Sequence, residues 1–322
     1  MRPGGPCTAD AIELTQVQFW KGNSMTKALT DYGPWGIVAG GSDGVGAAFA
    51  HEMASRGMNV VLVARRVPVL TAFADDIRAQ HGVEVRTVPL DLSAPQALSE
   101  LAQMTSELEI GLFVYNAGSD NSSATFLDKN LDTHLSLVHR NCGSVLEAAY
   151  RFGAPMVARG RGALVLVTSG AAWAGGATLA AYGATKAFDL ILAEGLWAEW
   201  RDSGVDVLGL VLGKTDTPSM HRVLDPEGES GGEVADPRDV AEQALDHLGD
   251  GPTWIWGNNP MGGSPFGAMS RREAVLTMSR GAAISSPGAE VFEPERAAGG
   301  AAGCRPVRQA GGLPRIGTET NL

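Results

Sequence analysis

Residues 35–66 read WGIVAGGSDGVGAAFAHEMASRGMNVVLVARR. Two continuous apolar runs, residues 35–39 and 59–64, flank a glycine-rich turn and a segment whose apolar positions have helical spacing. Continuous apolar runs of this length are typical of strands that are buried on both faces of a parallel sheet. The stretch therefore predicts a strand, a turn, a helix and a second strand parallel to the first.

The same alternation of apolar runs and helical patterns continues along the chain to residue 256. Because strand–helix–strand crossovers are right-handed, it favours an α/β fold: a doubly wound, Rossmann-like parallel sheet of about seven strands with helices on both faces. Ligands then bind beyond the carboxyl ends of the strands. The expected strands are residues 35–39, 59–64, 84–89, 110–115, 163–168, 205–212 and 253–256, and the expected helices are residues 45–56, 69–81, 95–108, 179–200 and 237–248. Residues 131–157 are expected to contain a further, long helix.

Composition along the chain separates three segments. Residues 25–280 carry the alternating pattern and predict a single Rossmann-fold domain. Residues 1–24 lack sustained periodicity and are expected to be a flexible N-terminal extension, with Met25 as an alternative start. Residues 281–322 contain AAGGAAG and RQAGGLPRIG and few large apolar residues, which is typical of a disordered tail. This tail explains part of the glycine content, which is 42 of 322 residues.

Charge and composition exclude several classes of protein. The chain has 25 basic and 36 acidic residues, and this net charge of −11 argues against a nucleic-acid footprint. No apolar run approaches the roughly 18 residues of a membrane span, and the N-terminus lacks the apolar core of a secretory signal. The three cysteines lie far apart and the six histidines form no HExxH motif, which predicts a cytoplasmic protein without a catalytic metal.

The glycine turn has the pattern G-x-x-x-G-x-G and directly follows the first predicted strand. Glycine is needed where a backbone must approach phosphate oxygens, and the N-terminus of the following helix favours negative charge. The turn therefore predicts a dinucleotide site, although an ordinary strand–helix turn would use the same residues. Its candidate contacts are Gly40, Ser42, Asp43, Gly44, Val45 and Gly46.

The end of the second predicted strand bears on which coenzyme is bound. An acidic residue in the position of Ala64 would bind the ribose 2′-hydroxyl of NAD. Arg65 and Arg66 follow instead, and a guanidinium suits a 2′-phosphate. Asp43 in the glycine turn opposes this reading. The sequence thus favours NADP(H), with NAD(H) as the alternative coenzyme and a solvated arginine pair as the purely structural explanation.

Tyr182 and Lys186 stand four residues apart at the start of a predicted helix, so they share one helical face. With four tyrosines and five lysines in the chain, chance would produce such a pair only about 0.06 times. A nearby cation favours the phenolate, which suits Tyr182 to proton transfer near neutral pH.

Ser169, at the end of a predicted strand, can donate to a substrate oxygen. Asn141 lies within a predicted helix, where asparagine is unfavourable, and this hints at a role in the site. The structural alternative for Ser169 is an ordinary turn serine, and that for Asn141 is a polar hydrogen bond in the core.

With these motifs in this order and spacing, the chain resembles the short-chain dehydrogenase/reductase family, in its short single-domain branch, over roughly residues 25–280. Asn141, Ser169, Tyr182 and Lys186 match the catalytic tetrad of that family. Besides the glycine turn, the coenzyme contacts that the resemblance implies are Asp91, Leu92, Asn116, Ala117, Gly118, Tyr182, Lys186, Gly213, Thr215 and Thr217.

The resemblance also implies a role for each tetrad residue. In the family the Tyr transfers a proton while the nicotinamide exchanges a hydride with the substrate carbon, and the Lys binds the nicotinamide ribose and lowers the Tyr pKa. The Ser orients the substrate oxygen, and the Asn holds a water in the proton relay. The chain departs from the family pattern at Ala39, Tyr115 and Leu212, where Thr, Asn and Pro are common, so we expect the nearby loop geometry to differ.

Residues 217–235 fall where the family carries a mobile lid over the substrate. Met220, Val223 and Leu224 are the apolar candidates of this segment. Trp173 is expected to form a wall of the pocket, with plain core packing as the alternative. Together these side chains favour a bulky, apolar carbonyl or alcohol as substrate.

The sequence therefore predicts an NADP(H)-dependent oxidoreductase that interconverts a ketone and a secondary alcohol, with Tyr182 as general acid and base. The alternatives are an NAD-dependent alcohol dehydrogenase of the same fold and a non-catalytic, coenzyme-binding sensor. The intact tetrad argues against the sensor. The resemblance further implies a homodimer or homotetramer, and neither nucleic acid nor a membrane is expected as a partner.

Overall fold

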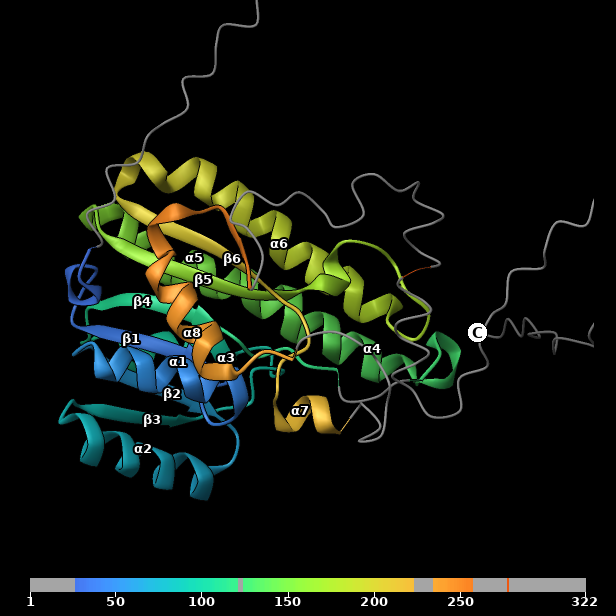
Figure 1. Ribbon diagram of the computed structural model, residues 1–322, viewed down its shortest axis with the longest axis horizontal. Helices are drawn as coiled ribbons and strands as arrows, with labels where there is room; N and C mark the ends of the chain where they lie inside the picture. Colours follow the sequence, from blue (N-terminus) through green and yellow to red (C-terminus); the bar gives the residue numbers. More distant parts are fainter. Residues whose placement is uncertain (1–26, 121–123, 223–233, 257–276, 278–322) are drawn as a thin grey trace, which may run out of the picture. The chain divides into compact units, whose positions relative to one another are not determined.

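The computed structural model describes residues 27–120, 124–222, 234–256 and 277. Its centre is one sheet of seven parallel strands in the order β3-β2-β1-β4-β5-β6-β7 (Figure 1). The strands are β1 Trp35–Ala39, β2 Asn59–Ala64, β3 Val85–Pro89, β4 Ile110–Tyr115, β5 Gly162–Ser169, β6 Val205–Leu212 and β7 Thr253–Ile255. The predicted doubly wound α/β fold is confirmed, since the chain first builds outward from β1 to β3 and then returns to β4 on the other side of β1.

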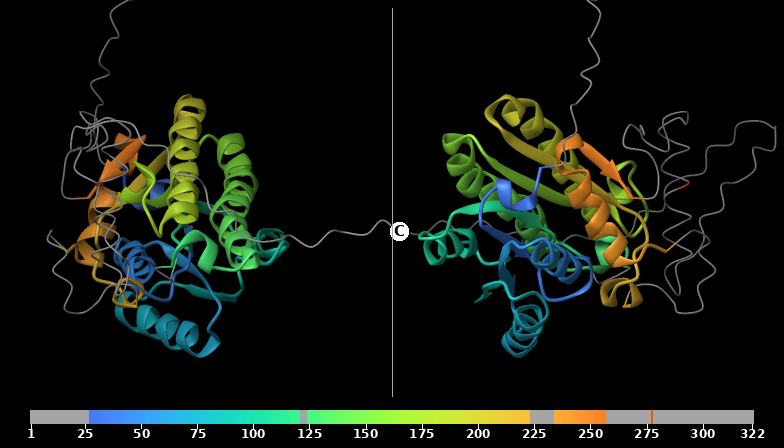
Figure 2. Two further views of the ribbon diagram at one scale, coloured as in Figure 1. Left: turned by 90° about the vertical axis from the view of Figure 1, so that its right-hand side faces the viewer. Right: turned by 60° about the vertical axis from the view of Figure 1, so that its left-hand side comes forward.

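Helices cover both faces of this sheet, as the two views of Figure 2 show. One face packs against α1 Gly44–Ser55, α2 Val67–His81 and α8 Pro237–Asp246, and the other against α3 Ala97–Met104, α5 Ser144–Arg159 and α6 Ala180–Trp200. The remaining helical elements are η1 Leu29–Asp31, η2 Phe126–Asp128, α4 Leu131–Val138, η3 His139–Gly143, η4 Gly170–Ala172, η5 Arg201–Ser203, α7 Pro218–His221 and η6 Leu248–Asp250.

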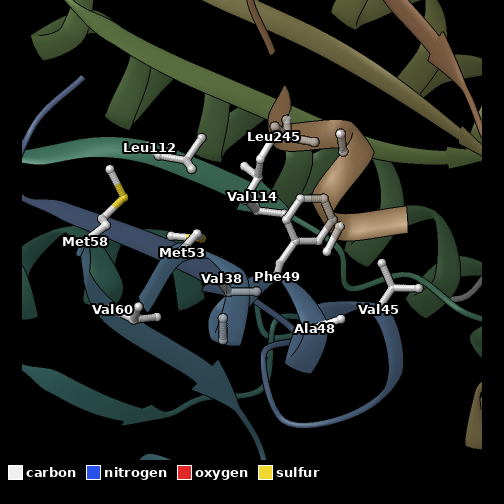
Figure 3. Packing of buried hydrophobic residues seen from close by; sticks show 14 of the residues in the cluster. Val38, Val45, Ala48, Phe49, Met53, Met58, Val60, Leu112, Val114 and Leu245 are labelled. Atoms are coloured by element: carbon white, nitrogen blue, oxygen red, sulfur yellow. The ribbon is translucent and has the colours of Figure 1, made fainter. Parts of the chain in front are cut away.

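Alternate residues of the central strands face the two helical layers. On β1, Val38 belongs to the hydrophobic cluster shared with α1, α2 and α8, whereas Ile37 belongs to the cluster shared with α3, α5 and α6. Figure 3 shows the first cluster, in which the fully buried Phe49 of α1 lies among apolar side chains from β1, β4 and α8. This double burial explains why the strands are continuous apolar runs in the sequence.

Residues 131–157 contain a long helix as expected, α5, but Asn141 does not lie within it. A π-helical turn, η3, separates α4 from α5 and carries Asn141, which is fully buried. The Asn141 side chain donates hydrogen bonds to the Gly118 carbonyl and to Thr185 Oγ1, at 3.0 and 2.9 Å. A π turn inserts one extra residue into a helix and is frequent at functional sites. The interruption therefore turns a polar side chain inward.

The two predicted chain ends, residues 1–24 and 281–322, lie outside the described residues. Among the helices that the structure describes, none combines the length and the apolar composition needed to cross a membrane. All the described residues belong to one compact unit.

Candidate active site

A cavity of about 1530 Å³ lies at the carboxyl ends of the strands. Its centre is the point where the strand order reverses, because Asn116, directly after β4, donates its backbone N–H to Ala39 at the end of β1. This is the place where open α/β sheets bind ligands. The predicted residues that line it are Gly40, Ser42, Asp43, Gly44, Val45, Arg65, Arg66, Asp91, Leu92, Asn116, Ala117, Gly118, Ser169, Trp173, Tyr182, Lys186, Gly213, Thr215, Thr217 and Met220.

Four predicted residues stand apart from that cavity wall. Gly46 and Asn141 lie behind it: Gly46 packs against the glycine turn itself, and Asn141 is fully buried in η3. Val223 and Leu224, with most of the proposed lid, lie outside the described residues.

The glycine turn packs backbone against backbone. A Cβ atom on Gly46 would lie 2.1 Å from the Gly40 carbonyl oxygen and 2.7 Å from Asn116 Nδ2. Gly40 has a φ of +83°, and a Cβ there would lie 3.1 Å from the backbone nitrogen of Ala117. The turn thus holds the N-terminus of α1 against the end of β4 and leaves that N-terminus facing the cavity. Asp43, the residue before α1, makes no side-chain cap to the helix. A helix N-terminus of this kind fits a dinucleotide pyrophosphate.

Arginine side chains gather where the cavity meets the end of β2. Asp43 Oδ2 lies 3.4 Å from Arg66 Nη2 and 3.8 Å from Arg222 Nη2, so the acidic residue that opposed a phosphate site is itself partnered by two guanidinium groups. Arg65 also lines the cavity and makes no ion pair within the described part of the chain. The arginines therefore give the cavity a net positive charge near the end of β2.

Arg140 is a further member of this group that sequence reasoning missed. It follows α4 in η3, lines the cavity and donates from Nη2 to the Ser119 carbonyl at 2.9 Å. Burial lowers the pKa of the Arg140 guanidinium, and the positive charge of Arg65 lowers it further, against the opposing effect of Tyr115. Only its position before Asn141 in the sequence could have suggested it.

Tyr182, Lys186 and Ser169 all line the same cavity. Tyr182 and Lys186 lie in the first two turns of α6, and Ser169 is the last residue of β5. Ser169 Oγ accepts a hydrogen bond from the Ala171 backbone at 3.3 Å, which fixes the side chain and leaves its own O–H able to donate. Tyr182 and Ser169 are half-buried, so both hydroxyls can reach a ligand.

Lys186 is held in the protein interior. Its Nζ donates to the Val167 carbonyl at 2.9 Å and to Asp189 Oδ2 at 3.0 Å, and the two charged side chains are 5% and 2% exposed. Burial raises the pKa of the Asp189 carboxyl to about 6, although Lys186 pulls it downward. Sequence reasoning missed Asp189, because an acidic residue three positions after a lysine is usually an exposed helical pair.

The Asn141 amide links these elements. Its Nδ2 bonds to Thr185 Oγ1, and Thr185 Oγ1 in turn donates to the Tyr182 carbonyl at 2.8 Å. A Cβ atom on Gly118, which has a φ of +149°, would lie 3.0 Å from Asn141 Oδ1 and 3.1 Å from Lys186 Nζ. The glycine at position 118 therefore lets the amide and the ammonium approach the end of β4 together. Asn141 is fully buried and does not line the cavity, so it holds the neighbouring elements in place without facing the cavity itself.

Other parts of the cavity wall carry apolar and ionic groups. Trp173 and Met220 line it as predicted, together with Trp256 after β7, which sequence reasoning did not single out. Lys129 Nζ and Asp120 Oδ2 form an ion pair at 2.7 Å on the wall, with side chains only 7% and 12% exposed. No group of three or more metal-ligating side chains occurs among the residues that the structure describes.

Comparison with known proteins places these features in a family. Residues 35–228 match the sequence profile of the short chain dehydrogenase family. A 7β-hydroxysteroid dehydrogenase of Collinsella aerofaciens is 34% identical over 221 residues, which cover 68% of this chain and 84% of that protein.

Two solved structures are also similar. A 7β-hydroxysteroid dehydrogenase superposes with a TM-score of 0.72 at 31% identity, covering 78% of this chain and 99% of that one. A short-chain dehydrogenase from Sphingobium yanoikuyae in complex with NADPH superposes with a TM-score of 0.63 at 30% identity, covering 69% of this chain and 86% of that one. The chain therefore belongs to the short-chain dehydrogenase family and is an NAD(P)-dependent oxidoreductase that acts on CH–OH groups.

Proposed function

We propose that this protein is an NADP(H)-dependent oxidoreductase that interconverts a ketone and a secondary alcohol on a bulky, apolar, ring-containing substrate. The observation that carries the proposal is that Tyr182, Lys186 and Ser169 line the same cavity as the glycine turn. A proton-transfer group and a candidate dinucleotide site thus share one cavity, as reduction of a carbonyl by hydride requires.

The residues at the end of β2 support NADP(H) over NAD(H). Arg65 faces the cavity, and Asp43 is partnered by Arg66 and Arg222. A guanidinium binds a 2′-phosphate through charge-assisted hydrogen bonds, whereas NAD would bring only a hydroxyl to this position. When bound, the nicotinamide supplies or accepts the hydride at the substrate carbon. The NADPH complex of the Sphingobium relative agrees with this choice.

The side chains of the protein supply the proton and the polarisation. Ser169 donates a hydrogen bond to the substrate oxygen and holds the carbonyl beside Tyr182. The Tyr182 hydroxyl gives its proton to that oxygen during reduction and takes it back during oxidation. The Lys186 ammonium stabilises the phenolate that remains, because an opposite charge nearby favours the ionised form. Asn141 bonds to Gly118 after β4 and to Thr185 of α6, and so holds these two elements in place for this transfer.

The apolar side of the cavity supports a large substrate. Trp173, Met220 and Trp256 add large apolar side chains to the wall of the cavity that Ser169 also lines. Similarity to 7β-hydroxysteroid dehydrogenases over more than two thirds of the chain agrees with a polycyclic substrate. The cytoplasmic location expected from the cysteine pattern stays a prediction.

The proposal is tested by following coenzyme consumption with a ketosteroid, a large monocyclic ketone, a 3-oxoacyl thioester and a small charged oxo acid, each with NADPH and with NADH. We expect the highest kcat/KM with the ketosteroid or the monocyclic ketone. NADPH should be preferred at least about tenfold, the value of one charge-assisted hydrogen bond. Turnover of the small oxo acid alone would contradict the substrate class, and a preference for NADH would contradict the coenzyme.

We also infer that the protein forms a homodimer through α4, α5 and α6. Large apolar side chains are exposed along these helices: Leu135 and Val138 on α4, Leu146 and Tyr150 on α5, and Phe188 and Ile191 on α6. Phe188 and Ile191 also line a shallow groove along α6. Apolar surface that is contiguous over several helices usually marks a protein contact. A second copy of the chain, meeting the first through the same faces, would cover this surface.

Replacing Ile191, which is 65% exposed, with glutamate should convert the dimer to a monomer at micromolar concentration. Val67→Glu is the matched control, because Val67 is 53% exposed on α2, which covers the other face of the sheet. Light scattering after size-exclusion chromatography measures the mass of each protein. A monomeric unaltered protein, or an Ile191→Glu protein of unchanged mass, would disprove this interface.

A further inference from the structure

Asp189, the buried partner of Lys186, has no role in the proton transfer described above. Both residues lie on α6, with Nζ and Oδ2 3.0 Å apart and both side chains at most 5% exposed. Asp189 Oδ1 is buried as well, and it accepts no hydrogen bond from the described residues. Burying an incompletely bonded carboxylate costs free energy that an apolar side chain would avoid. A carboxylate that is buried at this cost beside the Lys186 ammonium points to a role in the electrostatics of the site.

The ionisable groups around Asp189 come from three elements. Lys186 is on its own helix, Tyr115 faces it from β4, and Cys142 faces it from η3. Burial is the main cause that raises the pKa of the Tyr115 hydroxyl, and the negative charge of Asp189 raises it further. Burial likewise raises the pKa of the Cys142 thiol to about 11, with a contribution from Asp189 and an opposing one from Lys186. Both groups are therefore neutral near pH 7, and Lys186 is the cation that Asp189 meets.

Asp189 also determines where the Lys186 ammonium points. An ammonium has three N–H donors, and two of them are used by the Val167 carbonyl and Asp189 Oδ2. These two acceptors hold Nζ beside Gly118, where an added Cβ would come within 3.1 Å of it. The lysine is thus fixed before any ligand arrives.

We propose that Asp189 is a positioning residue for proton transfer: its carboxylate fixes the Lys186 ammonium and offsets part of its positive charge, so that Tyr182 keeps its proton to a higher pH than an uncompensated Tyr–Lys pair would. This inference rests on the proposed roles of Tyr182 and Lys186. Its consequence is a bias toward carbonyl reduction near neutral pH, because reduction needs Tyr182 as a proton donor.

The sign and size of the effect follow from the charges. Removing the carboxylate leaves a net positive charge near the phenol, which stabilises the phenolate and lowers the pH at which Tyr182 ionises. Tyr182 and Asp189 are seven residues apart on α6, which corresponds to roughly 10 Å along the helix. A unit charge at that distance, at an effective dielectric constant of about 20, shifts a pKa by about one unit.

The test is an ultraviolet titration of phenolate absorbance in Asp189→Asn and in the unaltered protein, each corrected by subtracting the matching protein that also carries Tyr182→Phe. The subtraction isolates Tyr182 and needs neither substrate nor coenzyme. We expect Tyr182 to ionise about one pH unit lower in Asp189→Asn, and the alkaline limit of ketone reduction with NADPH to move in the same direction. Asp189→Glu, which restores the charge, should move both values back toward those of the unaltered protein.

Glu194→Gln is the matched control, because Glu194 is also on α6 and accepts a hydrogen bond from Thr253, remote from the cavity. It should leave the titration of Tyr182 unchanged. If Asp189→Asn does not fold, Asp189→Leu removes the same charge with a side chain suited to the interior, and the same shift is expected. An unchanged or higher ionisation pH of Tyr182 in the folded variant would overturn the inference.

The outcome also separates this inference from the proposed function. If the titration shifts but the unaltered protein reduces no ketone, the electrostatic role of Asp189 stands and the proposed function fails. If Tyr182→Phe abolishes ketone reduction while Asp189→Asn leaves the titration unchanged, the proposed function stands and the role of Asp189 fails.

Discussion

Replacing Tyr182 with phenylalanine should lower kcat for ketone reduction by about 10²–10⁴-fold, the usual contribution of a positioned general acid. The substitution removes only the hydroxyl of a half-buried ring that lines the cavity, so the wall keeps its shape. The Kd for NADPH should therefore stay within about threefold of the unaltered value, since an interaction made only in the transition state lowers kcat without lowering binding. Steady-state kinetics and fluorescence titration with NADPH give the two quantities.

Tyr150→Phe is the matched control for this experiment. Tyr150 lies on α5 with 77% of its surface exposed and is not part of the cavity wall, so the loss of its hydroxyl should leave both kcat and Kd unchanged. Substantial turnover by Tyr182→Phe would show that another group supplies the proton and that the mechanism above is wrong.

Gly46→Ala should damage both the stability of the domain and the binding of the coenzyme. The new Cβ would lie 2.1 Å from the Gly40 carbonyl oxygen, and that oxygen belongs to the glycine turn, which cannot give way without moving the N-terminus of α1. Overpacking of this kind costs about 1–3 kcal/mol of unfolding free energy. Displacement of the turn should also weaken NADPH binding more than about tenfold, because the backbone N–H groups that face a pyrophosphate lose their alignment.

Gly195→Ala separates the steric effect from the simple change of residue type. Gly195 lies in α6, and a Cβ atom there meets nothing within 4 Å. Since alanine is the better helix former by up to about 1 kcal/mol, this variant should be as stable as the unaltered protein or slightly more stable. Thermal unfolding and NADPH titration of the two variants measure the contrast. Equal behaviour of Gly46→Ala and Gly195→Ala would contradict the packing argument.

Much of the fold could be predicted because its strands are buried on both faces. Burial on both faces leaves no alternation in the sequence, and runs such as residues 59–64 and 205–212 have the same bounds in the structure as in the prediction. Helix ends were less well defined: α3 spans Ala97–Met104 where residues 95–108 were expected, because polar residues continue the helical pattern after the apolar face has ended. The π turn at residues 139–143 has no periodicity of its own and was missed for that reason.

The candidate site divides in a similar way. Tyr182, Lys186 and Ser169 could be found because each combines a chemically active side chain with a place at a strand end or a helix start. Asp189 and Arg140 could not, because a charged residue in a helix is ordinarily solvated, and only the tertiary structure shows that Asp189 is buried and that Arg140 is half-buried in the cavity wall. The structure gives a second reason for glycine at position 46, because a Cβ there would collide with the backbone of the turn; its contact with the coenzyme stays a prediction.

The length of the π turn between α4 and α5 determines the rotation of α5 about its own axis. The buried positions on its two sides are His134, Leu137, Asn141, Ser144, Val145 and Ala148. Each residue of an α-helix adds about 100° of rotation. A single inserted or deleted residue in η3 would therefore turn the sixteen residues of α5 by about 100° and carry its buried side chains away from the sheet. The number of residues in this turn thus fixes which face of α5 is buried.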